Sequence, residues 1–212
     1  MVIAIDGPAG AGKSTVARGL AAELGFTYLD SGAMYRCVAL TCLEWGADPT
    51  ASGEATSTAE SIEIGFDDGD VLIDGVPVTG EIRTPEVTEA ASQVSIHPGV
   101  RAAMVAEQQR LIATGPYVTE GRDIGTVVAP DSPLKVFLTA SPEARAERRA
   151  AETGQPVAEV LAAQEERDRR DSEREHGALY AAEDAVTIDS SGMSADQVIA
   201  EIAALARDRG LA

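Results

Sequence analysis

Short apolar runs alternate along the chain with longer segments whose apolar residues recur at helical spacing. The runs predicted to form buried strands are 2–5, 26–30, 117–119, 134–138 and 185–188. Helical spacing is clear after the first run, where Val16, Leu20 and Leu24 fall on one face. Further helices are predicted over 33–45, 86–93, 100–112, 157–175 and 194–209, and another from 141. Five strands alternating with helices predict an α/β fold with a central parallel five-stranded sheet and helices on both faces.

The pattern changes between residues 46 and 99. A stretch of polar and small residues through Ser61 shows no clear period. Beyond it, Ile62, Ile64 and Phe66 alternate with polar or small residues, and Asp-Gly turns join this run to the apolar runs that follow. Period-two runs joined by such turns predict a small antiparallel meander, which we interpret as an insertion into the α/β chain.

Residues 7–15 match the phosphate-binding motif G-x-x-x-x-G-K-[ST], the P-loop. The residues predicted to bind ATP are Gly7, Pro8, Ala9, Gly10, Ala11, Gly12, Lys13, Ser14 and Thr15. The glycines allow consecutive backbone N–H groups to point at an anion. Lys13 is predicted to act catalytically on the β- and γ-phosphates, and Ser14 to hold Mg²⁺. Because a strand precedes the loop and a helix follows it, we expect the three-layer fold of P-loop NTPases.

Composition narrows the class of function. The chain has 212 residues, 44% of them hydrophobic, which suits one globular domain with insertions. Its formal net charge of −18 disfavours nucleic acid as a partner, because such partners need a basic face. Cys37 and Cys42 are expected to pack as reduced side chains, and His97 and His176 are too scattered for a zinc site. No leader or membrane-length apolar run is present, so we expect a cytoplasmic protein with no membrane partner.

Nearly all of the basic residues are arginines, so the places where arginines gather are informative. One cluster, on the helix predicted after the fourth strand, consists of Arg145, Arg148 and Arg149. A second helix face presents Arg167, Asp171 and Arg174 at i, i+4 and i+7. The two helices are predicted to form a mobile lid over phosphates, although exposed ion pairs of small energetic value also explain the second face.

A charged pair bracketed by glycines follows the third predicted strand. Arg122 and Asp123 lie within residues 121–126, directly at the carboxyl end of that strand. Ligands of open α/β sheets bind beyond the carboxyl ends of the strands, so this segment is predicted to belong to a site. An exposed turn with a local ion pair is the alternative interpretation.

Several of these segments together resemble bacterial cytidylate kinases, a family of nucleoside monophosphate (NMP) kinases. The matching segments are 5–8 with the P-loop, 29–36, 82–84, 91–95 with Pro98 and Arg101, 121–126, and 166–168 with Asp171 and Arg174. The resemblance covers essentially the whole chain, and the inserted meander is itself typical of the family. It implies reversible transfer of the γ-phosphoryl group of ATP to CMP or dCMP, with Mg²⁺, in pyrimidine nucleotide metabolism.

The resemblance also implies roles for individual residues. Arg36, Arg122 and Arg174 would hold the CMP phosphate, and Arg122 and Arg174 would act catalytically by neutralising the transferring group. Ser92, Arg101 and Asp123 would read the cytosine edge, with Ser31 lining the pocket. Arg167 and Asp171 would contact the ribose. The lid arginines Arg145, Arg148 and Arg149 would lie over the adenine or the phosphates of ATP, and Arg148 is taken as the contact among these three alternatives.

The family pattern implies three parts and a monomer. The expected core comprises 1–45, 100–144 and 176–212, the NMP-binding insert 46–99, and the helical lid 145–175. One departure concerns the exit from the lid. The family pattern continues Ala-Pro-Leu after the lid arginine, whereas this chain has Gly177-Ala178-Leu179, so the exit is expected to be looser.

Two alternatives are open at the level of sequence. A kinase for another small acceptor, such as UMP or a hydroxy acid, would need neither the meander nor the cytosine-reading residues. A P-loop switch or regulatory ATPase would instead carry switch segments and a separate effector surface. The predicted convergence of arginines on a small pocket favours a kinase over a switch.

Overall fold

The computed structural model describes residues 1–67, 69–173 and 177–211. The chain forms two compact units, one of residues 1–30 with 111–212 (unit 1) and one of residues 31–110 (unit 2). Unit 2 is thus inserted into the sequence of unit 1. No helix among the described residues is both long and apolar enough to cross a membrane.

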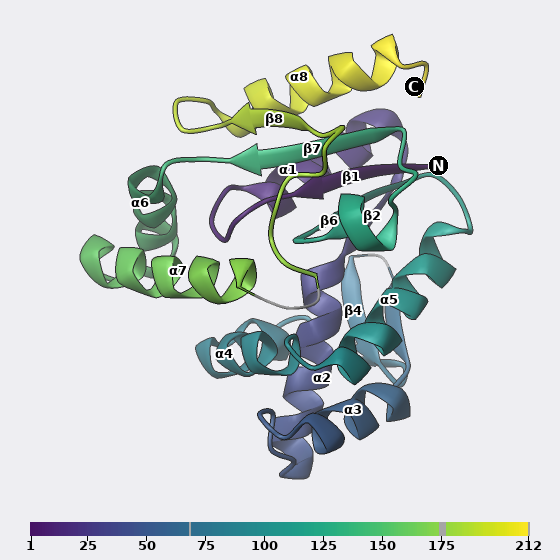
Figure 1. Cartoon of the computed structure of the whole chain (residues 1–212), viewed down its shortest axis with the longest axis vertical. Coiled ribbons are helices and arrows are strands. Elements are labelled where there is room, and N and C mark those ends of the chain that lie inside the picture. The colour runs from purple at the N-terminus through teal and green to yellow at the C-terminus, as the bar shows by residue number, and fades with distance from the viewer. Residues whose placement is uncertain (68, 174–176, 212) are drawn as a thin grey trace. The chain divides into compact units, whose positions relative to one another are not determined.

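Unit 1 is built on a parallel sheet of five strands. They are β1 (Val2–Asp6), β2 (Thr27–Asp30), β6 (Tyr117–Gly121), β7 (Leu134–Thr139) and β8 (Val186–Asp189). Their order across the sheet is β2-β6-β1-β7-β8, and every neighbouring pair is parallel (Figure 1). The predicted α/β fold with a five-stranded parallel sheet is therefore confirmed, and β1, which leads into the P-loop, is its central strand.

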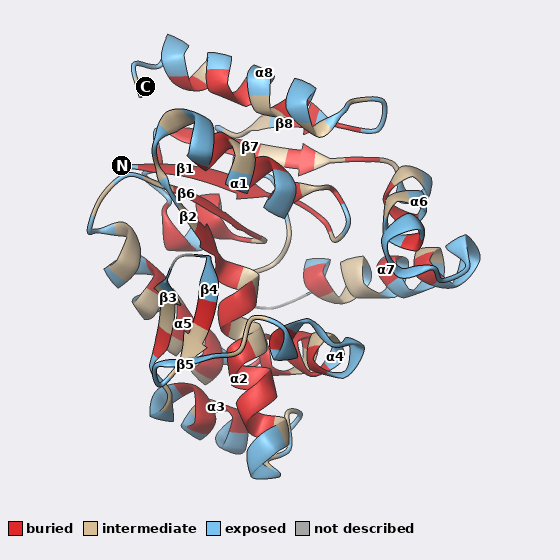
Figure 2. Cartoon of the chain, turned by 180° about the vertical axis from the view of Figure 1, so that it is seen from behind, coloured by how far each residue is buried: buried red, intermediate tan, exposed pale blue. Residues whose placement is uncertain are grey.

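The strands at the centre of this sheet are covered on both faces, as their continuous apolar sequences require. All five residues of β1 are buried, and Ile3, Ile5 and Leu138 have no exposed surface (Figure 2). The hydrophobic core combines these strands with α1 (Lys13–Leu24) and α8 (Ala195–Asp208), which also pack against each other. Burial of this core holds the ends of β1 and β6, and hence the loops that follow them, in fixed positions.

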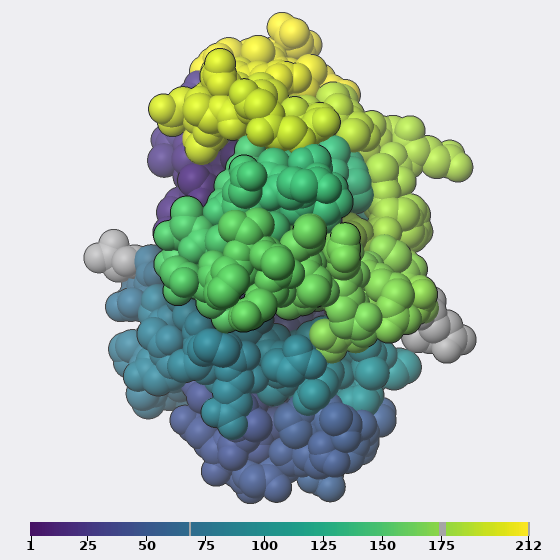
Figure 3. Space-filling model, turned by 90° about the vertical axis from the view of Figure 1, so that its left-hand side faces the viewer, coloured from purple at the N-terminus to yellow at the C-terminus, as the bar shows by residue number. Residues whose placement is uncertain are grey.

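Two further helices of unit 1, α6 (Pro142–Thr153) and α7 (Val157–Ser172), pack together around a small apolar cluster. Ala146, Ala150 and Val160 form that cluster, and the helices make one continuous green surface in the space-filling view (Figure 3). α6 begins at Pro142 after Ser141, whose hydroxyl accepts the Ala144 N–H; a serine N-cap followed by proline favours the start of a helix. A short π-helix, Ile124–Val128, follows β6 and was not predicted.

Unit 2 contains a small antiparallel sheet and four helices among its described residues. The strands are β3 (Ile64–Asp67), β4 (Asp70–Ile73) and β5 (Val76–Pro77), in the order β3-β4-β5. The helices are α2 (Ser31–Trp45), α3 (Ser52–Ser61), α4 (Pro85–Val94) and α5 (Pro98–Ile112), with a 3₁₀ turn at Glu81–Arg83. The predicted meander is confirmed by the antiparallel pairing of these strands.

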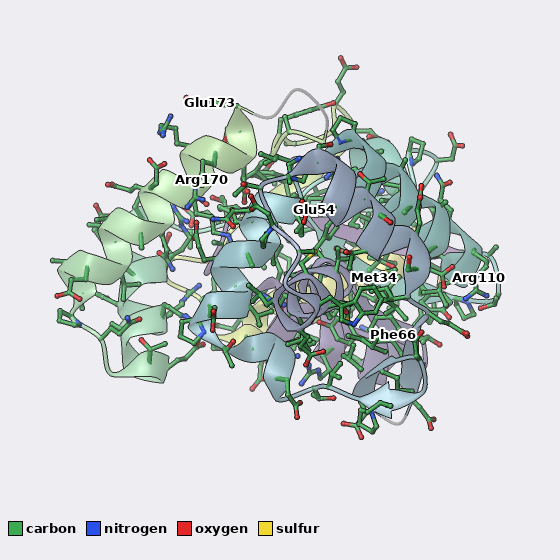
Figure 4. The ribbon with its side chains drawn as sticks, turned by 90° about the horizontal axis from the view of Figure 1, so that it is seen from below. Met34, Glu54, Phe66, Arg110, Arg170 and Glu173 are labelled. Atoms are coloured by element: carbon green, nitrogen blue, oxygen red, sulfur yellow. The ribbon has the colours of Figure 1, made fainter. Side chains whose placement is uncertain are left out.

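Helix α3 lies where the sequence shows no clear period. Its buried positions, Ala55, Thr58 and Ala59, have helical spacing but small side chains, so they give little hydrophobic contrast. Helix α2 contributes to the core of unit 2, where its Met34 side chain is fully buried (Figure 4). Arg110, on α5, points outward.

Candidate active site

The P-loop of unit 1 lies between β1 and α1 and has the backbone of an anion cradle. Gly10 and Gly12 have positive φ angles of 76° and 90°, which favour glycine. Gly7 is required for a second reason, because a Cβ there would lie 2.0 Å from the carbonyl oxygen of Leu138. The helix begins at Lys13, so its first N–H groups and its positive dipole end face the loop.

Lys13 is held as a buried cation at the start of α1. Its ammonium group donates to the carbonyl oxygen of Pro8 at 2.8 Å. Burial, followed by the positive charge of Arg122, lowers the pKa of Lys13 to about 7, although the carboxylate of Glu120 acts in the opposite direction. A bound phosphate would supply the negative charge that this cation lacks.

Ser14 is joined to a carboxylate at the end of the adjacent strand. Its hydroxyl donates to Glu120 Oε1, which also accepts the Tyr28 hydroxyl at 3.2 Å. The parallel register of β1 and β6 pairs Ile5 with Glu120, which places this side chain beside the P-loop. Sequence reasoning missed Glu120. The signal was an acidic residue at the carboxyl end of a predicted strand, immediately before Gly121.

The Ser14–Glu120 pair fits a magnesium ion better than a softer metal. Hydroxyl and carboxylate oxygens are the hard donors that Mg²⁺ prefers, and Mg²⁺ usually keeps substrate phosphates and water as its other ligands. The described part of the chain contains no group of three or more His, Cys, Asp or Glu side chains that could hold a metal ion. A metal held here would therefore need oxygens from the nucleotide.

Arg122 and Asp171, which sequence reasoning assigned to separate parts of the acceptor, form an ion pair in the structure. Arg122 Nε donates to Asp171 Oδ2 at 2.7 Å, and the side chains are 18% and 1% exposed. A buried pair of this kind is held strongly, because removing one partner leaves the other charge uncompensated. The pair connects the end of β6 to the last turn of α7.

Asp123 lies beside Arg122 and is buried at 6% exposure. The next two residues, Ile124 and Gly125, donate their backbone N–H groups to Asp6. Arg122 and Asp123 therefore lie between the end of β6 and two backbone N–H groups that are bonded to Asp6.

The arginines of the predicted lid differ sharply in their surroundings. Arg145 is buried, donates to the carbonyl oxygens of Ala9 and Ala140 and pairs with Asp168. Asp168 in turn accepts the Ala9 N–H at 3.3 Å, so α7 contacts the P-loop directly. Arg148 donates to the hydroxyl and carbonyl oxygens of Ser190.

The other arginines of the predicted lid have different surroundings, or lie outside the described residues. Arg149 is exposed and pairs with Glu152. Arg167, on α7, is one of the positive charges that lower the Lys13 pKa. Arg174, predicted to be catalytic, lies outside the described residues.

Unit 2 carries the other predicted acceptor residues, Ser31, Arg36, Ser92 and Arg101. Arg101 is buried on α5, and its guanidinium donates to the Tyr35 hydroxyl on α2 at 3.5 Å. Ser92 is 4% exposed on α4, which packs against α2, and within the described chain its hydroxyl has no hydrogen-bond partner. Buried hydroxyls are normally paired, so an unpartnered one is a candidate ligand contact.

A hollow of about 380 Å³ in unit 2 contains none of the predicted site residues. Its lining includes Ile64, Met104 and Arg110. Arg110 is paired there with Glu107, so the hollow offers no free cation for a phosphate.

The P-loop, the parallel sheet and the buried arginines together define a P-loop kinase. The same architecture occurs in the shikimate kinase from Bacteroides thetaiotaomicron, with a TM-score of 0.51 and 12% identity over 98% of each chain. A likeness at that identity supports the fold.

Sequence comparison identifies the family. The sequence profile described as "Cytidylate kinase" matches residues 3–208. The cytidylate kinase of Mycobacterium leprae is 46% identical over 215 residues, covering 99% of this chain and 96% of that protein. The cytidylate kinase of Solibacter usitatus is 45% identical over 216 residues, covering 99% and 93%. The chain belongs to the cytidylate kinase family of phosphotransferases.

Proposed function

We propose that this chain transfers the γ-phosphoryl group of ATP reversibly to CMP or dCMP, giving ADP and CDP or dCDP, as a step of pyrimidine nucleotide metabolism. The observation that carries the proposal is the P-loop with its buried Lys13, whose pKa is lowered to about 7. A cation so destabilised is suited to a phosphate ligand. The proposed acceptor, CMP or dCMP, is inferred from the relatives, which are named cytidylate kinases.

ATP is proposed to bind with its phosphates in the P-loop, residues 7–15. Lys13 would contact the β- and γ-phosphates, and Arg148 would lie near the nucleotide. Ser14 and Glu120 would hold Mg²⁺, which when bound neutralises charge on the phosphate oxygens. The direct hydrogen bond between these two side chains supports their assignment to one site.

The acceptor phosphate is proposed to be held by arginines. Planar guanidinium groups bind phosphate oxygens with two donors and neutralise charge that moves during transfer. The residues proposed for this role are Arg36, Arg122 and Arg174. No general base is needed, because the oxygens of the acceptor phosphate are already nucleophilic.

Cytosine is proposed to be recognised by Asp123, Arg101 and Ser92. A carboxylate accepts a hydrogen bond from the N4 amino group, and a guanidinium donates to O2 and N3. Uracil reverses the polarity at positions 3 and 4, which would leave a buried carboxylate facing an oxygen. The buried Ser92 hydroxyl supports this assignment. Ser31 would line the pocket, and Arg167 and Asp171 would contact the ribose.

We also propose that the protein acts as a cytoplasmic monomer without nucleic-acid or membrane partners. The net charge of −18 supports the absence of a nucleic-acid partner. Light scattering coupled to size-exclusion chromatography would give the mass of one 22.0 kDa chain if the monomer proposal holds.

Product identification by ³¹P NMR tests the proposed function. Mg·ATP is incubated with CMP, with dCMP, with shikimate and without acceptor. We expect ADP to form together with CDP or dCDP, and little ADP without a cytidine nucleotide. ATP hydrolysis that is equally fast without any acceptor would support a switch or regulatory ATPase instead. Transfer to shikimate in preference to CMP would reassign the acceptor.

A further inference from the structure

Asp6 is the last residue of β1 and the residue immediately before the P-loop. Its carboxylate accepts two hydrogen bonds from successive backbone N–H groups in the segment that follows β6. Oδ1 accepts from Ile124 at 2.8 Å, and Oδ2 accepts from Gly125 at 2.7 Å. Both lengths are those of strong charge-assisted hydrogen bonds.

The two N–H groups belong to the segment that carries Arg122 and Asp123. Ile124 and Gly125 begin the π-helix directly after that charged pair. The approach is close, since a Cβ on Gly125 would lie 3.3 Å from Asp6 Oδ2 and 3.2 Å from a carbon of Lys135. The carboxylate therefore fixes the backbone on the carboxyl side of Arg122 and Asp123, while β6 fixes it on the other.

Ionisation of the Asp6 carboxyl group is unfavourable at this buried position. Burial raises the pKa of Asp6 to about 6, although its two backbone hydrogen bonds act in the opposite direction. Asp123 also raises this pKa, and Lys13 lowers it. The buried N–H groups of Ile124 and Gly125 need acceptors, and the carboxylate supplies one oxygen to each, so Asp6 ties the residue before the P-loop to this segment despite its own desolvation.

We propose that Asp6 is a positioning residue that joins the start of the P-loop to the Arg122–Asp123 segment and thereby orients the two side chains toward the acceptor. The inference rests on the proposed function, which assigns Arg122 to the acceptor phosphate and Asp123 to cytosine. Asp6 touches neither substrate. It acts through the backbone of the segment that does.

The variant Asp6→Asn tests this role, because it keeps the shape but offers one acceptor and turns an amide N–H₂ toward the second N–H group. We expect the KM for CMP to rise about tenfold and the ratio of kcat/KM for CMP over UMP to fall by a similar factor. The KM for ATP is expected to stay within about twofold of the original value.

Ser132→Ala is the matched control. The Ser132 hydroxyl is also buried, and it ties the opposite end of β1 by donating to the carbonyl oxygen of Val2 at 2.7 Å. We expect this variant to lose thermal stability without a change in either KM or in base selectivity. Identical kinetic behaviour of the two variants would overturn the proposal, as would an equal rise in both KM values for Asp6→Asn.

A second variant, Gly125→Ala, perturbs the same contact from the other side and decides the question if Asp6→Asn does not fold. It is expected to raise the KM for CMP and lower base selectivity, and unchanged constants would count against the proposal. Failure of the proposed function would give a different result from failure of the Asp6 proposal, because the unsubstituted protein would then form no CDP. If it forms CDP and the variants behave like Ser132→Ala, only the role of Asp6 is lost.

Discussion

At the scale of single residues, Lys13 is the clearest case of a charged group that burial destabilises. The ammonium group is buried, donates to Pro8 and lies near the positive charges of Arg122 and Arg167. Such a cation is costly in the free protein and is stabilised when phosphate arrives. The same interaction strengthens as charge builds on the transferring group, which is the condition for catalysis.

Replacing Lys13 with Ala is therefore expected to lower kcat on the order of a thousandfold. The measurement is the steady-state rate at saturating Mg·ATP and CMP. Lys135→Met is the control, because Lys135 is the chain's other lysine and binds the exposed carboxylate of Asp184 at 2.9 Å. A near-normal kcat for Lys13→Ala would remove the residue from the charge-neutralising role.

Asp6 gives a prediction for stability against pH. Its folded-state pKa of about 6 lies above the ordinary value of 3.8, so the folded protein binds the proton more tightly than the unfolded chain does. This contribution to stability is fully present below pH 3.8 and is lost as pH rises through about 6. Relative to Asp6→Asn, the original protein should lose about 1.4 kcal/mol of unfolding free energy between pH 5 and pH 8.

Urea unfolding of both proteins at the two pH values measures this difference. Lys13 lowers the pKa of Asp6, and Asp6 in turn raises the pKa of Lys13, so the measured difference includes the change in the Lys13 titration as well. A stability gap that does not change with pH would show that the Asp6 pKa is not raised by folding.

At the scale of elements, side chains from two other elements, α1 and β2, contact the end of β6. Glu120 is bonded to Ser14 at the start of α1 and to Tyr28 on β2. The Tyr28 hydroxyl thus orients the carboxylate that we assign to Mg²⁺. Such outer partners usually tune metal affinity without touching the metal.

Tyr28→Phe is expected to raise the Mg²⁺ concentration for half-maximal rate by about tenfold, at the lower end of effects for outer partners. The measurement is the rate as a function of free Mg²⁺ at fixed ATP. Tyr117→Phe serves as control, because the Tyr117 hydroxyl shares a hydrogen bond of 3.2 Å with the exposed Thr114 hydroxyl. An unchanged Mg²⁺ dependence for Tyr28→Phe would argue against a role for this hydroxyl in orienting Glu120.

Helix α6 offers a comparison between two arginines four residues apart. Arg145 is buried and holds Ala9, Ala140 and Asp168, whereas Arg149 is exposed and pairs with Glu152. Arg145→Ala should cost about 2–4 kcal/mol of unfolding free energy, because it leaves several buried partners unmet. Arg149→Ala should cost less than about 0.5 kcal/mol. Similar losses in urea unfolding would contradict this account of the two α6 arginines.

The elements that the sequence predicted carry large apolar side chains at strand or helix spacing. The five strands of unit 1 were found because each is a short apolar run. Helix α3 was missed because Ala55, Thr58 and Ala59 give a weak pattern. Periodicity did not predict the π-helix Ile124–Val128, which is only five residues long and whose first two N–H groups donate to the carboxylate of Asp6, far away in sequence.

At the scale of the whole molecule, the motif residues were easier to predict than their supporting contacts. Lys13 and Ser14 belong to a contiguous motif with a known geometry. Glu120 and Asp6 belong to the site only through the register of β1 beside β6, which a single sequence does not reveal. The domain boundaries at 46–99 and 145–175 and the roles of the acceptor residues stay predictions.

The central claim is that this chain phosphorylates a cytosine nucleotide by reading the base. The most direct test is kcat/KM with Mg·ATP for CMP and UMP, with dCMP, AMP and GMP measured in parallel. We predict that CMP and dCMP are used at least about a hundredfold better than UMP, because a carboxylate and a guanidinium match only the cytosine edge. Comparable values for CMP and UMP would contradict this account of base selection.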